Sequence, residues 1–543
     1  MSEPARRDGR DEAVAAPSGS RRALRRSTIV VTALNLLSRA TGFIRVLATA
    51  SALGVTVLGD TYQRSNQVSN LLFELLAGGM LFSVLVPGFV DLLTAGDRAS
   101  ARRLAAVLSG RGLAAMAVLV ALVMAFSQPL MALLSAGADP ATRDAQAELG
   151  AFLLWFVAPQ LLFYLVGAIA SGLLQSDQRF AAAAFAPVCN NVVVTASMVA
   201  FAIVHDPARG LALTTGEKVL LGAGALAGTV AMTVVPLVAV RRAGLGFGLG
   251  WRTDGLALRE MAERGAWGAG HVGLNEVLVL ATIVLAGSVP GGVIAYQTAF
   301  TFFLLPHALL AHPIFTTIYP HLASSGTAGR YDEFADDLGR SLRSICALVL
   351  PAAGLGAVVA FPVLAHLDMG ALTSTGTRLV AMVLAAYLTG LAGYSSFFLL
   401  TRASYALGDA RTPTIVNAVA TAGSIVAMAL AAVLLDGTAL LVSFGLINAV
   451  GTTGGSIALH RHVVHRMGVA VPVAGSIARS TAITVTSCAA AAVLALAIGW
   501  DSRTDAALAA VTCVTGGGLT ALATNHLLGG DLPMLSRRLR GAA

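Results

Sequence analysis

Two arginines, Arg39 and Arg45, lie inside a stretch that is otherwise apolar enough to cross a membrane, STIVVTALNLLSRATGFIRVLATASALG at residues 27–54. A guanidinium at bilayer depth is costly, and it usually faces the interior of a helical bundle or a water-filled cavity. Guanidinium groups also bind phosphate oxygens in pairs and stay charged at any physiological pH. These residues therefore predict a positively charged polar interior, suited to an anionic group.

The spacing of Arg39 and Arg45 limits how they can act together. Six residues correspond to about 240° around an α-helix, so the two side chains do not share one face. Gly42 lies between them and permits a bend that would turn both toward one cavity. The alternative interpretation is that one of the arginines forms a structural ion pair with Asp60 or Glu74.

The next apolar segment carries a second group of polar residues. We take Arg64 and Asn70 as further candidate substrate-binding residues, and Asp60 and Glu74 as candidates for ion coupling or gating. Glu74 has apolar neighbours on both sides. It is therefore either a carboxylate that binds a coupling ion or the ion-pair partner of a first-helix arginine.

A histidine and a glutamate, His271 and Glu276, lie near the start of a later apolar segment. An intramembrane histidine usually donates a hydrogen bond to a neighbouring helix, but the nearby carboxylate favours a role in ion coupling or gating. The sequence contains no nucleotide-binding loop, zinc-protease motif or nucleophile elbow. We expect no catalytic residue, no metal and no cofactor, so transport would draw on an ion gradient, the membrane potential or the substrate gradient.

The composition indicates a polytopic membrane protein. Of 543 residues, 56% are hydrophobic and 12% are charged, and the mean hydropathy is +0.78. Soluble domains contain about 25% charged residues. Segments of ten residues with alternating polarity do not recur, which excludes a membrane β-barrel and predicts an all-α fold.

A helix needs about 20 mainly apolar residues to cross the hydrocarbon layer. By that criterion we expect about fourteen transmembrane helices, which begin near residues 28, 61, 102, 148, 180, 216, 260, 291, 336, 375, 412, 437, 474 and 505. The predicted organisation is a disordered Arg-rich tail (1–27), a first six-helix bundle (28–242), a second six-helix bundle (256–467), a terminal helix pair (474–529) and a basic tail (530–543).

The positive charges predict the orientation of the chain. If both termini are cytoplasmic, 28 of the 36 Lys and Arg residues fall on the cytoplasmic side, five on the other side and three inside helices. This asymmetry is typical of membrane proteins that follow the positive-inside rule. The net charge of +8 therefore indicates anionic membrane lipids as partners, and not nucleic acid.

The two predicted bundles resemble each other at a separation of about 233 residues. Gly54 corresponds to Gly287, and LLQSDQR (173–179) corresponds to YALGDAR (405–411). Six spans in each half give parallel repeats, an arrangement that binds substrate between the halves and exposes it to each side in turn.

Four segments resemble the MurJ/MviN family of lipid II flippases, within the multidrug/oligosaccharidyl-lipid/polysaccharide exporter superfamily. They are LSRATGFIR, LGDTY, NLLFELLAGGMLFSVLVPGFV and YALGDARTPTIVN. Ser38, Arg39, Gly42 and Arg45 match the family pattern in the first helix, and Asp60 matches its acidic residue at the start of the second.

The resemblance implies a flippase that carries undecaprenyl-pyrophosphate-linked peptidoglycan precursor (lipid II) from the inner to the outer leaflet. It implies a multi-pass protein of the bacterial cytoplasmic membrane, with a polyprenyl-pyrophosphate glycolipid and cell-wall synthesis proteins as partners. Many members carry a basic pair where this chain has Phe73 and Glu74, and an arginine near the position of Thr301. Arg64 is a candidate replacement for that charge.

Three other functions remain open at this stage. The closest is a flippase for another polyprenyl-linked polysaccharide, since the sequence does not fix the headgroup. A multidrug or cation antiporter of the same superfamily usually has twelve spans, and a basic cavity would repel cationic drugs. A membrane glycosyltransferase would need acidic residues in a sizeable external loop, and the external loops predicted here are short.

The predicted orientation can be tested with single cysteines in a variant whose native cysteines are replaced by serine. Ser20→Cys and Arg540→Cys should be shielded from an impermeant thiol reagent in intact cells. Asp206→Cys, in a predicted external loop, should react and serves as the control. Labelling of either terminus would contradict the topology.

Overall fold

The computed structural model describes residues 18–74, 98–246, 248–251, 258–365, 373–500 and 502–529. Helices make up the regular structure, and no strand occurs within these ranges, so the predicted all-α class is confirmed. The predicted carboxyl-terminal tail and most of the amino-terminal tail lie outside the described residues. Within the latter, α1 already begins at Ser18, because Ala, Leu and Arg residues favour continuation of the helix beyond the apolar run.

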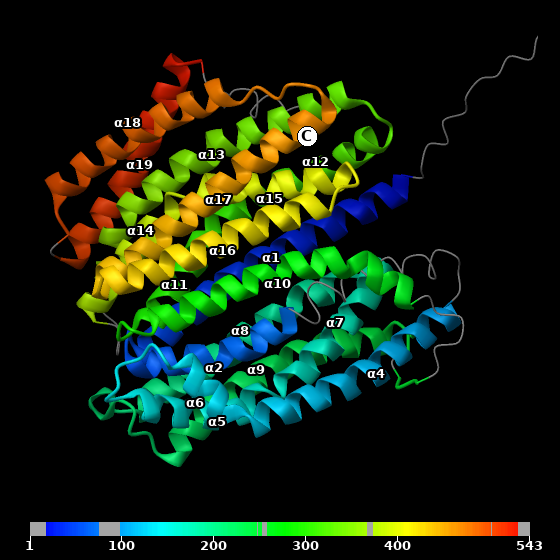
Figure 1. The fold of residues 1–543 in the computed structure, drawn as a ribbon, viewed down its shortest axis with the longest axis vertical. Coiled ribbons are helices and arrows are strands. Elements are labelled where there is room, and N and C mark those ends of the chain that lie inside the picture. Colours follow the sequence, from blue (N-terminus) through cyan, green and yellow to red (C-terminus); the bar gives the residue numbers. More distant parts are fainter. Residues whose placement is uncertain are drawn as a thin grey trace, which may run out of the picture.

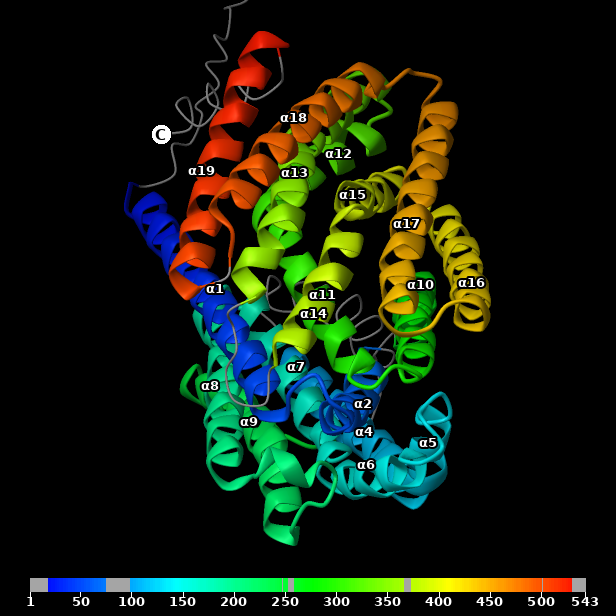
Figure 2. The ribbon, with the colours of Figure 1, turned by 90° about the vertical axis from the view of Figure 1, so that its left-hand side faces the viewer.

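The helices form two lobes, with the terminal pair packed against the second (Figures 1 and 2). The first lobe contains α1 (Ser18–Leu53), α2 (Val57–Phe73), α4 (Arg98–Ala125), α5 (Ser127–Leu134), α6 (Arg143–Val157), α7 (Gln160–Ser176), α8 (Phe180–Val204), η2 (Pro207–Arg209) and α9 (Thr215–Arg242). Within it, α8 packs between α1 and α9. Figure 1 shows α1 running along the boundary between the lobes.

The second lobe contains α10 (Leu258–Ala286), α11 (Gly292–Pro306), the π-helical turn η3 (His307–Ala311), α12 (His312–Thr327), α13 (Tyr331–Ala365), α14 (Ser374–Leu388), α15 (Leu391–Ala406), α16 (Arg411–Leu434) and α17 (Gly437–Met467). The terminal pair α18 (Ala474–Ile498) and α19 (Arg503–Leu527) packs against α13. In Figure 2, α10, α16 and α17 lie together on the side away from α1.

Eleven helices among the described residues are long and apolar enough to cross a membrane, or twelve if α14 and α15, which meet at 48°, form one span. Two further predicted spans correspond to α2, described only as far as Glu74, and to α10, whose apolar part is Gly270–Ala286. The count of fourteen spans therefore stays a prediction.

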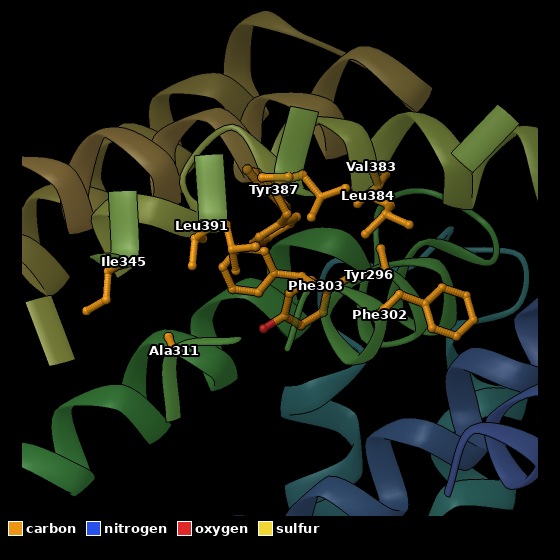
Figure 3. Packing of buried hydrophobic residues seen from close by; sticks show 14 of the residues in the cluster. Tyr296, Phe302, Phe303, Ala311, Ile345, Val383, Leu384, Tyr387 and Leu391 are labelled. Atoms are coloured by element: carbon orange, nitrogen blue, oxygen red, sulfur yellow. The ribbon is translucent and has the colours of Figure 1, made fainter. Parts of the chain in front are cut away.

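An aromatic cluster holds α11 against α14 and α15 in the core of the second lobe (Figure 3). The ring of Phe303 lies edge-on to Tyr387 and Tyr394, with centroid distances of 5.8 and 5.3 Å. Edge-to-face contacts of this kind stabilise aromatic pairs beyond the burial of their surface. They fix the position of η3, the turn that follows α11.

The fifth predicted span of each half contacts the first span of the same half through a buried asparagine. Asn191 of α8 donates from Nδ2 to the backbone oxygen of Ser38 at 3.1 Å, and Asn417 of α16 donates to the backbone oxygen of His271 at 3.2 Å. An amide that bridges two helices inside a bundle satisfies polar groups that water does not reach. The two halves thus place the same side chain at equivalent positions.

Candidate functional site

A carboxylate of the first lobe binds the amino-terminal end of a helix in the second. Asp60 accepts hydrogen bonds from the backbone N–H groups of Gly291 (2.8 Å) and Ile294 (3.0 Å) at the start of α11, and it is 2% exposed. The first N–H groups of a helix have no partner within the helix, and the helix dipole favours an anion there. Asp60 therefore closes one end of the boundary between the lobes.

Arg64 lies one turn further along α2 and is fully buried. Its Nη1 donates to Oε1 of Gln146 on α6, while Nε and Nη2 have no hydrogen-bond partner. A Cβ added at Gly287 would lie 2.2 Å from Nη2, so the guanidinium packs against the backbone that follows α10. Arg64 thus contacts α6 and the end of α10 beside Asp60, and none of the cavities described below includes it. Its predicted role in substrate binding stays a prediction.

Arg45 and Asn70 are brought together on the first-lobe side of the boundary. Both line a cavity of about 110 Å³ with Asn66, Gln160 and other polar side chains, and both line an adjoining cavity of about 310 Å³. The sequence correctly placed a polar interior beside the first helix. What it could not show is that amide and hydroxyl groups of α7, α8 and α9 complete the walls.

A third cavity, of about 380 Å³, lies on the second-lobe side and contains His271 and Glu276. The ring of His271 stacks on Phe397 with a centroid distance of 6.2 Å. Neither Nδ1 of His271 nor Oε2 of Glu276 has a hydrogen-bond partner. Two polar atoms without partners beside one cavity are suited to bind a proton, a cation or a polar group of a ligand.

Glu74 links the two sides. It lines the 310 Å³ cavity together with Arg45 and the 380 Å³ cavity together with Glu276. Among the described residues, no ion pair joins Glu74 to Arg39 or Arg45 in this conformation. The predicted pairing in one of two access states therefore stays a prediction.

Arg39 and Arg45 face different surroundings, as their angular separation predicts. Arg45 is half-buried among first-lobe side chains, whereas Arg39 is exposed and acts electrostatically on His307 and His312 of the second lobe. The helix runs unbroken through Gly42, where an added Cβ would lie 3.4 Å from Nδ2 of Asn191. That is an ordinary van der Waals distance, so packing against α8 does not require a glycine at this position. The role of Gly42 as a hinge stays a prediction.

Arg402 is a functional candidate that its place in the sequence did not reveal. It lies in α15, half-buried, with its guanidinium carbon 4.1 Å from the ring centre of Phe398 and 5.9 Å from that of Phe315. Cation–π contacts hold an arginine in place without neutralising it. Arg402 also acts electrostatically on His312, as Arg39 does, so both arginines approach the second-lobe segment around η3. The only sequence signal was its position four residues after Phe398 on a predicted helix.

Comparison with known proteins shows what this geometry resembles. The sequence model of the family described as "Lipid II flippase MurJ" matches residues 49–511. A "Probable lipid II flippase MurJ" of Rhizobium tropici is 28% identical over 400 residues, which cover 73% of each chain. The protein of the same description from Vibrio cholerae serotype O1 is 26% identical over 417 residues, 74% of this chain and 76% of that one.

Two solved structures share the fold. "Lipid II flippase MurJ, inward closed conformation" superposes with a TM-score of 0.73 at 17% identity and covers 92% of this chain and 98% of its own. An inward-facing multidrug resistance MATE family transporter superposes with a TM-score of 0.61 at 13% identity, over 81% of this chain and 98% of its own.

Removal of the Asp60 carboxylate should weaken the closed end of the boundary. Asp60→Ala leaves the first turn of α11 without its cap, a loss of about 1–2 kcal/mol. A cysteine at Ile294, which is fully buried, should then react with a maleimide severalfold faster in the purified protein. Asp206→Ala, which removes the cap of η2, is the control, and an unchanged rate with Asp60→Ala would contradict this role.

Proposed function

The chain belongs to the lipid II flippase MurJ family, and we propose that it moves lipid II across the membrane by alternating access. Members of this family are transporters and not enzymes. The observation that carries the proposal is the family match over residues 49–511, combined with Arg45 and Asn70 in a polar cavity at the boundary between two lobes.

The substrate would bind through its pyrophosphate on the α1 side of the boundary. Arg45 and Asn70 offer a guanidinium and an amide from the first lobe. Arg39 and Arg402 offer two more guanidinium groups near the second lobe. Because Arg402 has no ion-pair partner among the described residues, it supplies some of the positive charge that other members carry at the positions of Phe73 and Thr301.

Ion coupling would involve the acidic residues of the same boundary. Glu74 and Glu276 are close enough to interact electrostatically, and both line the 380 Å³ cavity with His271. Two carboxylates that share a poorly hydrated site favour uptake of a proton or a cation. Binding of that ion would reduce the repulsion between the carboxylates and an arriving pyrophosphate.

Gating would depend on Asp60. Its two hydrogen bonds to α11 hold one end of the boundary closed, so transport requires that they break when the opposite end closes. Arg64, buried beside the same contact, would then gain access to the cavity. A substrate shifts such an equilibrium only if it contacts the two states differently.

We assign the chain to the cytoplasmic membrane of a bacterium, with fourteen spans, both termini inside, and two parallel six-helix repeats. The equivalent asparagine contacts of Asn191 and Asn417 support the repeat, and the distribution of Lys and Arg supports the orientation. Anionic lipids of the inner leaflet and cell-wall synthesis proteins are the proposed partners. The decisive test of function is depletion of the protein, which should cause lipid II to accumulate on the cytoplasmic side.

A second function deserves a test because of Glu74 and Glu276. An acidic pair in the central boundary is also suited to exchange of an organic cation for a proton, and the MATE transporter shares the fold. In that case depletion would leave lipid II unchanged and would sensitise cells to cationic drugs. An oligosaccharide lipid other than lipid II would accumulate if the substrate were a different polyprenyl-linked glycan.

Loss of the first-helix arginines should abolish transport. Each charge-assisted hydrogen bond to phosphate is worth about 1.5–3 kcal/mol, so Arg39→Ala and Arg45→Ala should each reduce lipid II flipping at least tenfold. Arg402→Gln should also reduce it, by a smaller factor. Arg111→Ala, which removes a contact with Trp251 at the protein surface, should leave flipping unchanged.

Complementation of a flippase-depleted strain and the amount of protein in the membrane are measured together. Full activity of Arg39→Ala, Arg45→Ala and the double variant would remove both residues from the mechanism. Disappearance of the protein from the membrane would favour a purely structural ion pair.

Glu74→Gln should weaken flipping in vesicles and flatten its dependence on pH, because glutamine resembles the protonated carboxyl group. If Glu74 pairs with Arg45 in one access state, the effects of Glu74→Gln and Arg45→Ala should not add. Glu333→Gln, at an exposed position of α13, is the control. Strictly additive losses would show that the pair does not form.

A further inference from the structure

A large groove lies on the first lobe, and none of its lining residues lines the cavities at the boundary between the lobes. Its volume is about 820 Å³, and α1, α7, α8 and α9 contribute its walls. The walls are mostly apolar, and Phe185, Val234 and Val238 are 39%, 47% and 37% exposed. In a membrane these side chains face hydrocarbon, so an acyl chain fits the groove.

One end of the groove is cationic. Arg179, at the start of α8, and Arg242, in the last turn of α9, both line it. Arg179 is paired with Asp177 at 2.9 Å and remains 59% exposed. Arg242 forms no ion pair with a described residue. This end therefore carries a net positive charge beside an apolar groove, which is complementary to an anionic lipid.

In the second lobe, the carboxylate of Asp409 lies at the place that corresponds to the cationic end of the groove. Asp409 accepts hydrogen bonds from the backbone N–H groups of Arg411 and Thr412 at the start of α16. Its other oxygen lies 2.9 Å from His462 Nε2 and 3.2 Å from Arg466 Nη1 at the end of α17. One carboxylate thus neutralises the start of the fifth predicted span and the end of the sixth.

The surroundings of Asp409 favour its ionised carboxylate over the protonated carboxyl group. Burial acts to raise its pKa, but hydrogen bonds from Thr412 and His462 outweigh that effect and hold the pKa below the usual value. The sequence HRHVVH (460–465) lies in the last turns of α17 and supplies His462. The tract therefore serves this internal contact.

The corresponding aspartate of the first lobe makes different contacts. Asp177 corresponds to Asp409 in the repeat, but its carboxylate pairs with Arg179, and no side chain caps the start of α8. The first residues of α8, Phe180 to Ala182, line the groove directly, and Arg242 lies at the same end. A phosphate at this end would meet the start of α8 and an arginine at the end of α9, as the Asp409 carboxylate meets the start of α16 and Arg466 at the end of α17.

We propose that an acidic glycerophospholipid of the inner leaflet docks in this groove, with an acyl chain between α1, α8 and α9 and its phosphate between Arg179 and Arg242. The site is separate from the substrate cavity, and its assignment to the inner leaflet rests on the proposed orientation. The lipid would replace, in the first lobe, the ionic contact that Asp409 makes within the second.

Native mass spectrometry of the full chain can test this with dioleoyl phosphatidylglycerol and dioleoyl phosphatidylcholine as probes. The wild-type protein should retain one phosphatidylglycerol molecule more tightly than the neutral lipid. An arginine near a membrane surface contributes about a fivefold change in affinity for anionic lipid. Arg179→Gln and Arg242→Gln should each weaken retention by about that factor, and the double variant by more.

Arg241→Gln is the matched control, because Arg241 adjoins Arg242 in sequence but does not line the groove. It should leave retention unchanged. Equal retention of both lipids by the wild type, equal losses with Arg241→Gln and Arg242→Gln, or full retention by the double variant would each overturn the proposal. So would displacement of phosphatidylglycerol by an equimolar amount of undecaprenyl phosphate, since the groove would then belong to polyprenyl lipids. Because Arg45→Ala flipping is measured separately, failure of this site and failure of the proposed function are distinguishable.

Discussion

The hydrogen bonds between Asp60 and the start of α11 join the two lobes at one end of their boundary. A buried carboxylate is stable only if its oxygens are satisfied, and the first N–H groups of a buried helix need acceptors for the same reason. The carboxylate oxygens of Asp60 accept from these N–H groups, so both sets of polar groups are satisfied. Because they belong to different lobes, the contact joins the lobes. With α2 fixed against α11 at this end, Asn70 and Glu74, further along α2, necessarily line the boundary between the lobes. The polar cavity is thus a consequence of where the lobes are joined.

The charges around that cavity are divided by side. Arg45 lines the 310 Å³ cavity on the first-lobe side, Glu276 lines the 380 Å³ cavity on the second-lobe side, and Glu74 lines both. An anionic substrate cannot approach two ionised carboxylates without a loss of electrostatic energy that grows as water is excluded. A cation or proton on the carboxylates removes that loss. The proposed binding of an anion and uptake of a cation would then be coupled by proximity, without a mechanical link between distant sites.

Much of the fold was predictable because its signals are local. Long apolar segments identify helices, and Arg39 and Arg45 stand out because charge within such a segment is costly. Contacts between segments distant in sequence were not predictable. Nothing in the sequence shows that Arg64 is buried against Gly287 and Gln146. Arg402 was overlooked because an arginine near the end of a span looks like an ordinary topology signal, and only its contact with Phe398 and its nearness to the α1 side distinguish it.

Equivalent residues of the two proposed repeats keep their contacts at some positions and differ in their contacts at others. Asn191 and Asn417 make the same contact, because an unsatisfied amide or carbonyl inside either bundle carries the same cost. Asp177 and Asp409 occupy corresponding positions at the ends of predicted spans but bind different partners, Arg179 in the first lobe and His462 and Arg466 in the second. A polar group buried inside a bundle can pair only with other groups of the protein. At the membrane interface it can also pair with water or lipid. Differences between the halves at that interface therefore indicate where each half meets a different partner.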